Sequence, residues 1–226
     1  MYNKFSFFNA PIKPYTGKYG IRYSAQTAPT CEMDVLATWT MIRSNDVLRN
    51  LTCRLRSMES EAERREFKAT QFPFVTPCGT FVKRAASQVA SLSGLVVLDI
   101  DHLADLNEAN RVRDLLFDDP VLQPSLAFVS PSGLGVKLLV PYVFDLVHSV
   151  GCYSREEFDE RGSKPTAENL RTVSEQILFG MDYLNLKLQI SGDKKLTRKQ
   201  MECDFSGKDV SRACFLAFDP NAKLRT

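Results

Sequence analysis

The 226-residue sequence predicts an α+β fold, in which helices cover one face of a mixed or antiparallel sheet. The main observation is the order of patterns from residue 95 onward: a strand, a helix, two strands joined by a tight turn, and another helix. Only five residues, 131–135, separate the two central strands, which is too few for the crossover of a parallel pair. The composition, with 44% hydrophobic and 25% charged residues, is that of a globular protein.

Residues 1–70 are expected to form a less regular N-terminal α/β lobe. The first thirty residues are rich in Pro, Gly, Tyr and Lys and predict an irregular arm or short strands. Apolar residues at helical spacing predict helices between Glu32 and Met58, with a break and a new N-cap at 44–46. The charged run at 60–70 predicts a helix that faces solvent.

Residues 71–226 are expected to form the core, packed with the lobe as one compact unit. The core elements are predicted in this order: a short strand at 79–84, a buried strand at 95–101, an amphipathic helix at 105–117, hairpin strands at 125–130 and 136–142, a helix capped by Thr166, and a last strand at 212–218. This order suits a sheet of the RNA-recognition-motif kind and does not suit a parallel sheet.

Charge and cysteine content exclude several classes of protein. The formal net charge is only +2, so no global basic field indicates nucleic-acid binding, although local patches could still form. The six cysteines form no C-x-x-C pair and no cluster with histidine, which predicts reduced thiols rather than disulfides or structural zinc. No secretory apolar segment and no membrane-length run occurs, so we expect a cytoplasmic protein without a membrane partner.

The buried strand at 95–101 ends in two acids, Asp99 and Asp101. Because side chains alternate along a strand, both acids point the same way, while Ile100 points into the core. Two carboxylates on one face repel each other and resist desolvation unless something positive lies between them. A divalent metal is the usual partner, because hard cations prefer oxygen ligands. The alternative is a strand that ends in a polar turn with both acids solvated.

The turn between the central strands, Ser130–Lys137, combines two hydroxyls, two glycines and a lysine. A turn with exposed N–H groups and a nearby ammonium suits phosphate oxygens. It is not a P-loop, because no G-x-x-x-x-G-K-[ST] pattern occurs and the turn joins two strands. The alternative is an ordinary hairpin with a solvated lysine.

A third polar element, Cys203–Arg212, precedes the last predicted strand; alone, it would be a loop with a salt bridge. Together the three elements read strand-D-x-D, then S-x-S-G-x-G-x-K between strands, then an Asp with a downstream Ser-Arg. This order resembles the catalytic core of archaeo-eukaryotic-type primase-polymerases. The sequence around these motifs, including Gly79-Thr80-Phe81 followed by Arg84, looks closer still to one branch, the N-terminal domain of virulence-associated protein E (VirE) type, found in bacterial mobile elements. The resemblance covers residues 70–222.

The resemblance implies a primase-polymerase-like nucleotidyltransferase that acts in DNA replication or mobilisation of a mobile genetic element. Asp99, Asp101 and Asp204 would be the catalytic acids and would ligate two Mg²⁺ or Mn²⁺ ions. The nucleotide-binding residues that it implies are Ser130, Ser132, Gly133, Lys137, Arg212 and Arg84. The expected partners are nucleoside triphosphates and a single-stranded nucleic acid template. The chain contains no helicase-type ATPase motif, so it either acts alone or has a separate helicase-type ATPase as a partner.

Two other functions compete with this one. Many primases of the superfamily carry histidine at the place of Lys137, and a lysine lacks the planar donor of an imidazole. A catalytically degenerate module that binds nucleic acid or nucleotide is therefore the first alternative. A haloacid-dehalogenase-type phosphatase also has a strand ending in D-x-D, but it needs helices between its serine and lysine, where this chain has only a hairpin. His102 could be a further metal ligand or a solvated residue after the strand.

Overall fold

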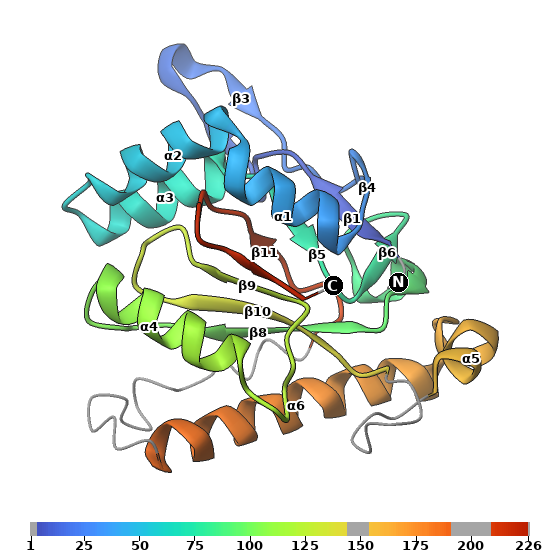
Figure 1. Cartoon of the computed structure of the whole chain (residues 1–226). Helices are drawn as coiled ribbons and strands as arrows, with labels where there is room; N and C mark the ends of the chain where they lie inside the picture. Colours follow the sequence, from blue (N-terminus) through green and yellow to red (C-terminus); the bar gives the residue numbers. More distant parts are fainter. Residues whose placement is uncertain (1–3, 144–153, 191–208, 226) are drawn as a thin grey trace.

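The computed structural model describes residues 4–143, 154–190 and 209–225. In these ranges the chain is α+β, as predicted, with helices α1–α6 and several small antiparallel sheets (Figure 1). The elements that carry most of the core are β8 (Leu95–Ile100), α4 (Leu106–Phe117), β9 (Leu126–Val129), β10 (Val136–Pro141), α6 (Ala167–Ile190) and β12 (Lys223–Leu224).

The central sheet has the strand order β12–β9–β10–β8, and all neighbouring strands in it are antiparallel. Strand β10 lies between β8 and β9, so that β8, α4 and β9 form a split β-α-β unit, as expected of an RNA-recognition-motif-like sheet. The antiparallel order contradicts the doubly wound parallel sheet that the phosphatase alternative requires.

The alternation of side chains along β8 divides the hydrophobic core in two. Val96, Leu98 and Ile100 belong to one buried cluster together with residues of α4 and α6. Leu95 and Val97 belong to a second cluster, which includes residues of the N-terminal helices and strands. The helices α4 and α6 therefore cover one face of the central sheet, and the N-terminal part of the chain covers the other (Figure 1).

This second layer, here called the N-terminal layer, consists of three helices and a sheet with the strand order β11–β5–β1–β4. Its elements are β1 (Phe5–Phe8), β4 (Cys31–Met33), α1 (Val35–Ser44), α2 (Asp46–Arg56), α3 (Glu61–Gln71), β5 (Phe74–Thr76) and β11 (Cys214–Phe215). The helix break predicted at 44–46 is confirmed, since the Asn45 side chain accepts a hydrogen bond from Leu48 N at 2.8 Å and caps α2. Because this sheet pairs β1 with β5, the division proposed at residue 70 lies between strands of one sheet.

The last predicted strand, at 212–218, is shorter than expected. Only Cys214 and Phe215 form β11, which pairs with β5 in the N-terminal layer. After it, Leu216 N donates to Pro73 O at 3.0 Å and Phe218 N donates to Thr52 Oγ1 at 2.9 Å. Because these N–H groups donate to Pro73 and Thr52 rather than to a paired strand, β11 ends at Phe215 although the alternating pattern continues.

The remaining elements are small. They are β2 (Tyr15–Thr16), β3 (Arg22–Tyr23), β6 (Gly79–Phe81), β7 (Val89–Leu92), α5 (Arg155–Glu157) and short helical turns at Lys18–Gly20, Ala86–Gln88 and Phe158–Gly162. The N-cap predicted at Thr166 is confirmed, since Thr166 Oγ1 accepts from Asn169 N at 3.2 Å. Asp105 caps α4 in the same way and accepts from Glu108 N at 2.8 Å. Among the described helices, none combines the length and the apolar character that crossing a bilayer demands.

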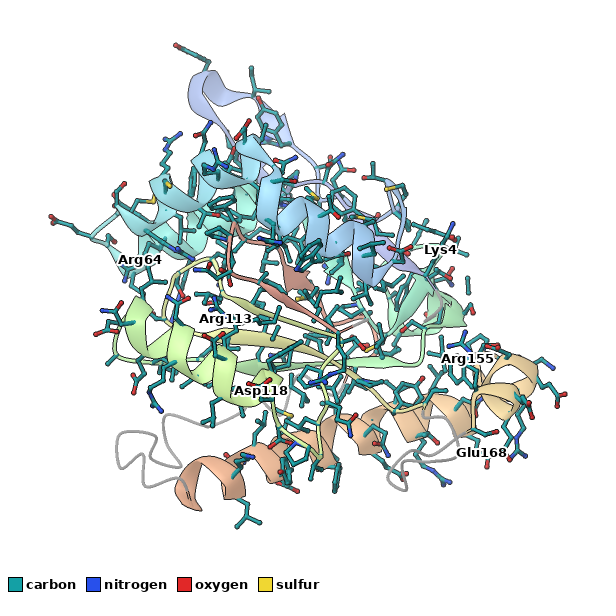
Figure 2. The ribbon with its side chains drawn as sticks, viewed as in Figure 1. Lys4, Arg64, Arg113, Asp118, Arg155 and Glu168 are labelled. Carbon is teal, nitrogen blue, oxygen red and sulfur yellow. The ribbon has the colours of Figure 1, made fainter. Side chains whose placement is uncertain are left out.

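A buried ion pair ties α4 to the C-terminal segment. Arg113, labelled in Figure 2, lies 3.0 Å from Asp219, and both side chains are almost completely buried. Asp219 also accepts a hydrogen bond from Val129 N, at the end of β9, at 2.9 Å. This carboxylate therefore holds α4, β9 and the segment after β11 together, next to the hairpin that follows β9.

Candidate functional site

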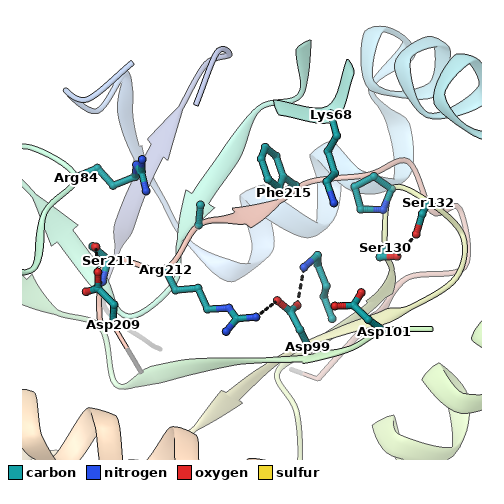
Figure 3. A pocket seen from close by; sticks show the side chains of 13 residues that line it. Lys68, Arg84, Asp99, Asp101, Ser130, Ser132, Asp209, Ser211, Arg212 and Phe215 are labelled. Carbon is teal, nitrogen blue, oxygen red and sulfur yellow. Dashed lines mark hydrogen bonds and ion pairs between the residues drawn. The ribbon is translucent and has the colours of Figure 1, made fainter. Parts of the chain in front are cut away.

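A pocket of about 350 Å³ opens beside the end of β8, on the face of the central sheet that points toward the N-terminal layer (Figure 3). It is lined by Lys68, Arg84, Asp99, Asp101, Ser130, Pro131, Ser132, Lys137, Asp209, Ser211, Arg212, Ala213 and Phe215. Seven of the nine site residues expected from the sequence are among them. They come from segments more than a hundred positions apart, which only the packing of both layers brings together.

Asp99 is the centre of the charge network in this pocket. Lys137 lies directly opposite it on β10, so both side chains share one face of the sheet, and Lys137 Nζ lies 2.5 Å from Asp99 Oδ1. Arg212 Nη2 donates to the other carboxylate oxygen at 3.0 Å. Burial alone would raise the pKa of Asp99, but the two cations outweigh it and lower this pKa below its usual value. Asp99 is therefore a largely buried carboxylate that is ionised at neutral pH.

Lys137 is held in its charged form by the same contact. Burial would lower the pKa of this ammonium, but the neighbouring Asp99 carboxylate, with smaller contributions from Cys214 and Asp101, raises it. The lysine is thus buried and charged at neutral pH. It is a fixed positive charge at the floor of the pocket.

Glycines let the hairpin approach β8 closely. A Cβ atom at Gly135 would lie 2.4 Å from Ile100 O and 2.9 Å from Asp101 Oδ1, so only glycine fits there. Gly133 has a φ of +79°, in the left-handed region that favours glycine, and it is not a lining residue of the pocket. Ser130 Oγ and Ser132 Oγ lie 3.1 Å apart at the rim.

Arg56, at the end of α2, fastens this hairpin to the N-terminal layer. Its guanidinium donates to Pro131 O at 3.2 Å and to Ser130 O at 3.1 Å. Burial lowers the pKa of Arg56, although an arginine remains charged in practice. The position of the two serines thus depends on a helix that precedes them by about seventy residues.

Asp101, the second acid of the D-x-D motif, is exposed and faces the same pocket as Asp99. Two carboxylates on one side of a pocket suit Mg²⁺, which proteins bind through one or two acids plus water and substrate phosphates. Within the described ranges, no group of three or more His, Cys, Asp or Glu side chains could hold a metal ion. Asp204, the expected third acid, lies outside the described residues. His102 is exposed and does not line the pocket.

Lys68 and Phe215 line the pocket and were not expected to do so. Lys68 was assigned to a solvated helix, yet its Nζ lies 5.5 Å from the centre of the Phe215 ring. Burial, followed by repulsion from Lys137, lowers the pKa of Lys68. No salt bridge joins Lys68 to another described residue, so its charge is available to an anionic ligand. No local pattern could have shown this, because the lysine reaches the pocket only through helix packing.

Two further lining residues, Asp209 and Ser211, belong to the third polar element of the sequence. Asp209 accepts hydrogen bonds from Ser211 N at 2.8 Å and Ser211 Oγ at 2.7 Å, which shapes the turn before Arg212. In Figure 3 Arg84 lies on the same side of the pocket as Asp209 and Ser211, and its guanidinium is 5.6 Å from the Phe74 ring centre. Its Nε is buried and has no hydrogen-bond partner among the described residues. A ligand oxygen could satisfy such a donor.

Comparison with known protein families gives a match in the middle of the chain. Residues 66–153 match the family model described as BT4734-like, N-terminal domain. The BT4734-like region begins within α3 and contains Lys68, Arg84, the D-x-D strand and the whole hairpin, whereas Arg212 lies beyond it. No curated protein and no solved structure shows a significant match. The family description names no activity, so any function must be argued from the chemistry of the pocket.

Proposed function

We propose that this pocket binds the phosphates of a nucleoside triphosphate, and that the chain is a primase-polymerase-like nucleotidyltransferase domain of the VirE type. The observation that carries the proposal is the meeting of three separate motifs in one pocket: Asp99 and Asp101, the Ser130–Lys137 hairpin, and Arg212. A volume of about 350 Å³ lies within the range of small-molecule sites. The expected biological context is the replication or mobilisation of a mobile genetic element.

The chemistry of the lining matches a polyphosphate. Four cationic side chains, Lys68, Arg84, Lys137 and Arg212, line the pocket together with three acids and the serines of the hairpin. Guanidinium and ammonium groups bind phosphate oxygens through charge-assisted hydrogen bonds. Lys68 is the cation best placed to contact a phosphate, because no salt bridge to another described residue would have to break first.

Asp99 and Asp101 would hold a divalent ion, with Asp204 as the expected third acid. When bound, Mg²⁺ or Mn²⁺ would neutralise the phosphate oxygens and position them for displacement. Both oxygens of Asp99 are engaged by Lys137 and Arg212. A nucleotide phosphate would attract these two cations and so leave Asp99 oxygens available, which couples phosphate binding to metal binding at the same acids.

The same ion pairs favour a second candidate function, an inert module that binds nucleotide or nucleic acid. A carboxylate that remains paired with two cations is a poor metal ligand, because the metal must compete with charges already in contact. In that case Lys137, placed where many primases have histidine, would stabilise the fold and hold phosphate without supporting catalysis.

A primer-synthesis assay on single-stranded DNA with Mg²⁺ or Mn²⁺ tests both candidates. The wild type is compared with an Asp99→Ala/Asp101→Ala variant and with Asp182→Ala, which removes an exposed acid from α6. Incorporation of labelled nucleotide by the wild type and Asp182→Ala alone supports the nucleotidyltransferase. If calorimetry detects nucleotide binding but no variant or wild type incorporates label, the inert module is supported. If the wild type neither binds nor incorporates nucleotide, the nucleotidyltransferase fails, and so does the inert module as a nucleotide binder.

A further inference from the structure

The pocket has two ends, and phosphate and metal binding account for only one of them. Figure 3 shows three labelled residues on either side of Asp99: Asp101, Ser130 and Ser132 on one side, and Arg84, Asp209 and Ser211 on the other. The first end carries the second acid of the D-x-D motif and the hydroxyls of the hairpin. We call Arg84, Asp209 and Ser211 the distal end.

Asp209 is an acid in a pocket for anions, but it does not belong to the metal site. It lines the same pocket as Asp99 and Asp101, yet in the part of the chain that the structure describes no three such side chains gather closely enough to hold a metal ion. Without a shared ion, its negative charge repels a phosphate. Asp209 therefore suits a neutral part of a ligand.

The Asp209 carboxylate is exposed and held in one orientation. Ser211 N donates to one of its oxygens at 2.8 Å, and Ser211 Oγ donates to the other at 2.7 Å. A carboxylate oxygen has two lone pairs, so each can accept a further hydrogen bond. The distal end thus offers a fixed acceptor to a hydroxyl group of a ligand.

Arg84 offers a donor at the same end. Its Nε is buried and has no hydrogen-bond partner among the described residues, which costs free energy until a ligand supplies one. The backbone of Arg84 is fixed, because its N donates to Thr27 O at 2.8 Å. An oxygen of a bound ligand would satisfy the Arg84 donor.

The lining also contains apolar surface that phosphates cannot use. Ala213 and Phe215, which follow Arg212 in the chain, both line the pocket. Binding sites for small molecules combine such apolar surface with a few polar groups that fix the orientation of the ligand. The carbon framework of a nucleoside suits this surface, so the pocket is lined for a whole nucleotide rather than for a polyphosphate alone.

We propose that the distal end binds the ribose of the nucleoside triphosphate, so that ribonucleotides bind in preference to deoxyribonucleotides. Asp209 accepts a hydrogen bond from the 2′-hydroxyl, and Arg84 donates to another oxygen of the nucleoside. The phosphates lie at the other end, beside Asp101 and the Ser130–Lys137 hairpin. This deepens the proposed function, on which it rests, by naming the class of nucleotide.

A sugar fits the distal end better than the edge of a base. The 2′-hydroxyl both donates and accepts, and it is the group by which a protein distinguishes ribonucleotides from deoxyribonucleotides. Dinucleotide-binding folds recognise it in the same way, with the carboxylate of an Asp or Glu. Contacts to base edges would favour one base, whereas a template-directed nucleotidyltransferase must accept nucleotides that share only their sugar and phosphates.

The test is calorimetry in Mn²⁺ with ATP, dATP, CTP and dCTP, and with inorganic tripolyphosphate, which lacks the nucleoside. The wild type should bind each ribonucleotide roughly 10- to 150-fold more tightly than its deoxy counterpart, as expected for one hydrogen bond to a charged group. Asp209→Ser should bring this ratio close to one, since a serine hydroxyl can keep the turn but is shorter and uncharged. Arg84→Met should weaken binding of every nucleotide and leave that of tripolyphosphate unchanged.

The matched controls are Asp182→Ser and Arg171→Met, which remove an exposed acid and an exposed arginine from α6, in the layer on the far side of the central sheet. Both should keep the affinities of the wild type. Binding of tripolyphosphate by Asp209→Ser shows that this variant is folded. The proposal is overturned if the wild type binds dATP as tightly as ATP, if its preference follows the base rather than the sugar, or if Asp209→Ser keeps the wild-type ratio.

The outcome is separable from that of the proposed function. A wild type that binds neither nucleotides nor tripolyphosphate contradicts the phosphate pocket itself. A wild type that binds ribonucleotides and deoxyribonucleotides equally well leaves the phosphate pocket standing and rejects only the ribose site.

Discussion

Replacing Lys137 with methionine removes one of the two cations that neutralise the buried Asp99 and is expected to destabilise the fold by about 3 kcal/mol. Methionine keeps nearly the same length and apolar stem, so the main change is the loss of charge. Asp99 and Lys137 each expose only 10% of their side chains, so water screens their interaction little. The charge of the Asp99 carboxylate would then be neutralised by Arg212 alone.

The magnitude follows from the geometry. At 2.5 Å and an effective dielectric constant of about 20, the attraction between the two charges is roughly 7 kcal/mol. Removing Lys137 also removes the desolvation cost of a buried ammonium, which is several kcal/mol. Arg212 remains 3.0 Å from Asp99 and continues to stabilise the charge. The free energy of unfolding is therefore expected to decrease by about 2–4 kcal/mol, close to the decrease found when one partner of a buried ion pair is removed.

Urea unfolding measures this loss, with fluorescence of the single tryptophan, Trp39, as the signal. Trp39 Nε1 donates to Ala222 O at 2.9 Å, so its environment changes when the layers separate. The control is Lys164→Met, which removes an exposed lysine and should change the free energy of unfolding by less than about 0.5 kcal/mol. A double-mutant cycle with Asp99→Asn should show a coupling energy above about 1.5 kcal/mol.

Two results would refute the reasoning. One is a Lys137→Met variant that unfolds at the same urea concentration as Lys164→Met. The other is a coupling energy near zero, which would mean that Lys137 and Asp99 stabilise the fold independently and that the ion pair is not the reason for their burial.

Further outcomes are expected from the same structure. Because the pKa of Asp99 is lowered in the fold, its contribution is present above the ordinary carboxylate value of 3.8 and is lost as the pH falls below it, so Asp99→Asn should flatten the acid limb of a plot of stability against pH. Gly135→Ala should destabilise the protein by about 1–3 kcal/mol in urea unfolding, since its Cβ would collide with a backbone carbonyl; an unchanged midpoint would contradict this. Lys68→Ala should weaken nucleotide binding about tenfold in calorimetry, whereas Lys164→Ala should not. As the pH rises, wild-type affinity should fall through a pKa below 10.5, because the Lys68 ammonium loses its proton there. Arg56→Ala should speed amide hydrogen exchange in residues 132–135 while exchange in α4 stays as in the wild type.

Local patterns were sufficient for several of the helices and strands. Asn45 between two apolar helical repeats predicted both a break and a cap, because capping depends on a side chain and a backbone group three residues away. The strand at 95–101 and the hairpin after Ser130 were likewise predictable, since the alternation of side chains and the turn glycines act over a few residues.

Long-range pairing was not predictable in the same way. Strand β12 contains only Lys223 and Leu224, too few residues to form a pattern, and it exists because β9 offers an edge. The buried strand Phe5–Phe8 lies in a segment expected to be an irregular arm or short strands, and its burial depends on β4 and β5 on its two sides. In both cases the stabilising contacts come from residues distant in sequence.

By itself the sequence determined that Asp99 and Asp101 share one face of a strand, and that a glycine hairpin carrying Lys137 follows. Only the tertiary structure decided what surrounds them. It placed Lys137 directly opposite Asp99, brought Arg212 to the second carboxylate oxygen, and turned Lys68 from a solvated helix position into a pocket cation. The physical reason is that periodicity orients a side chain relative to its own element, whereas its partners depend on which elements pack against one another.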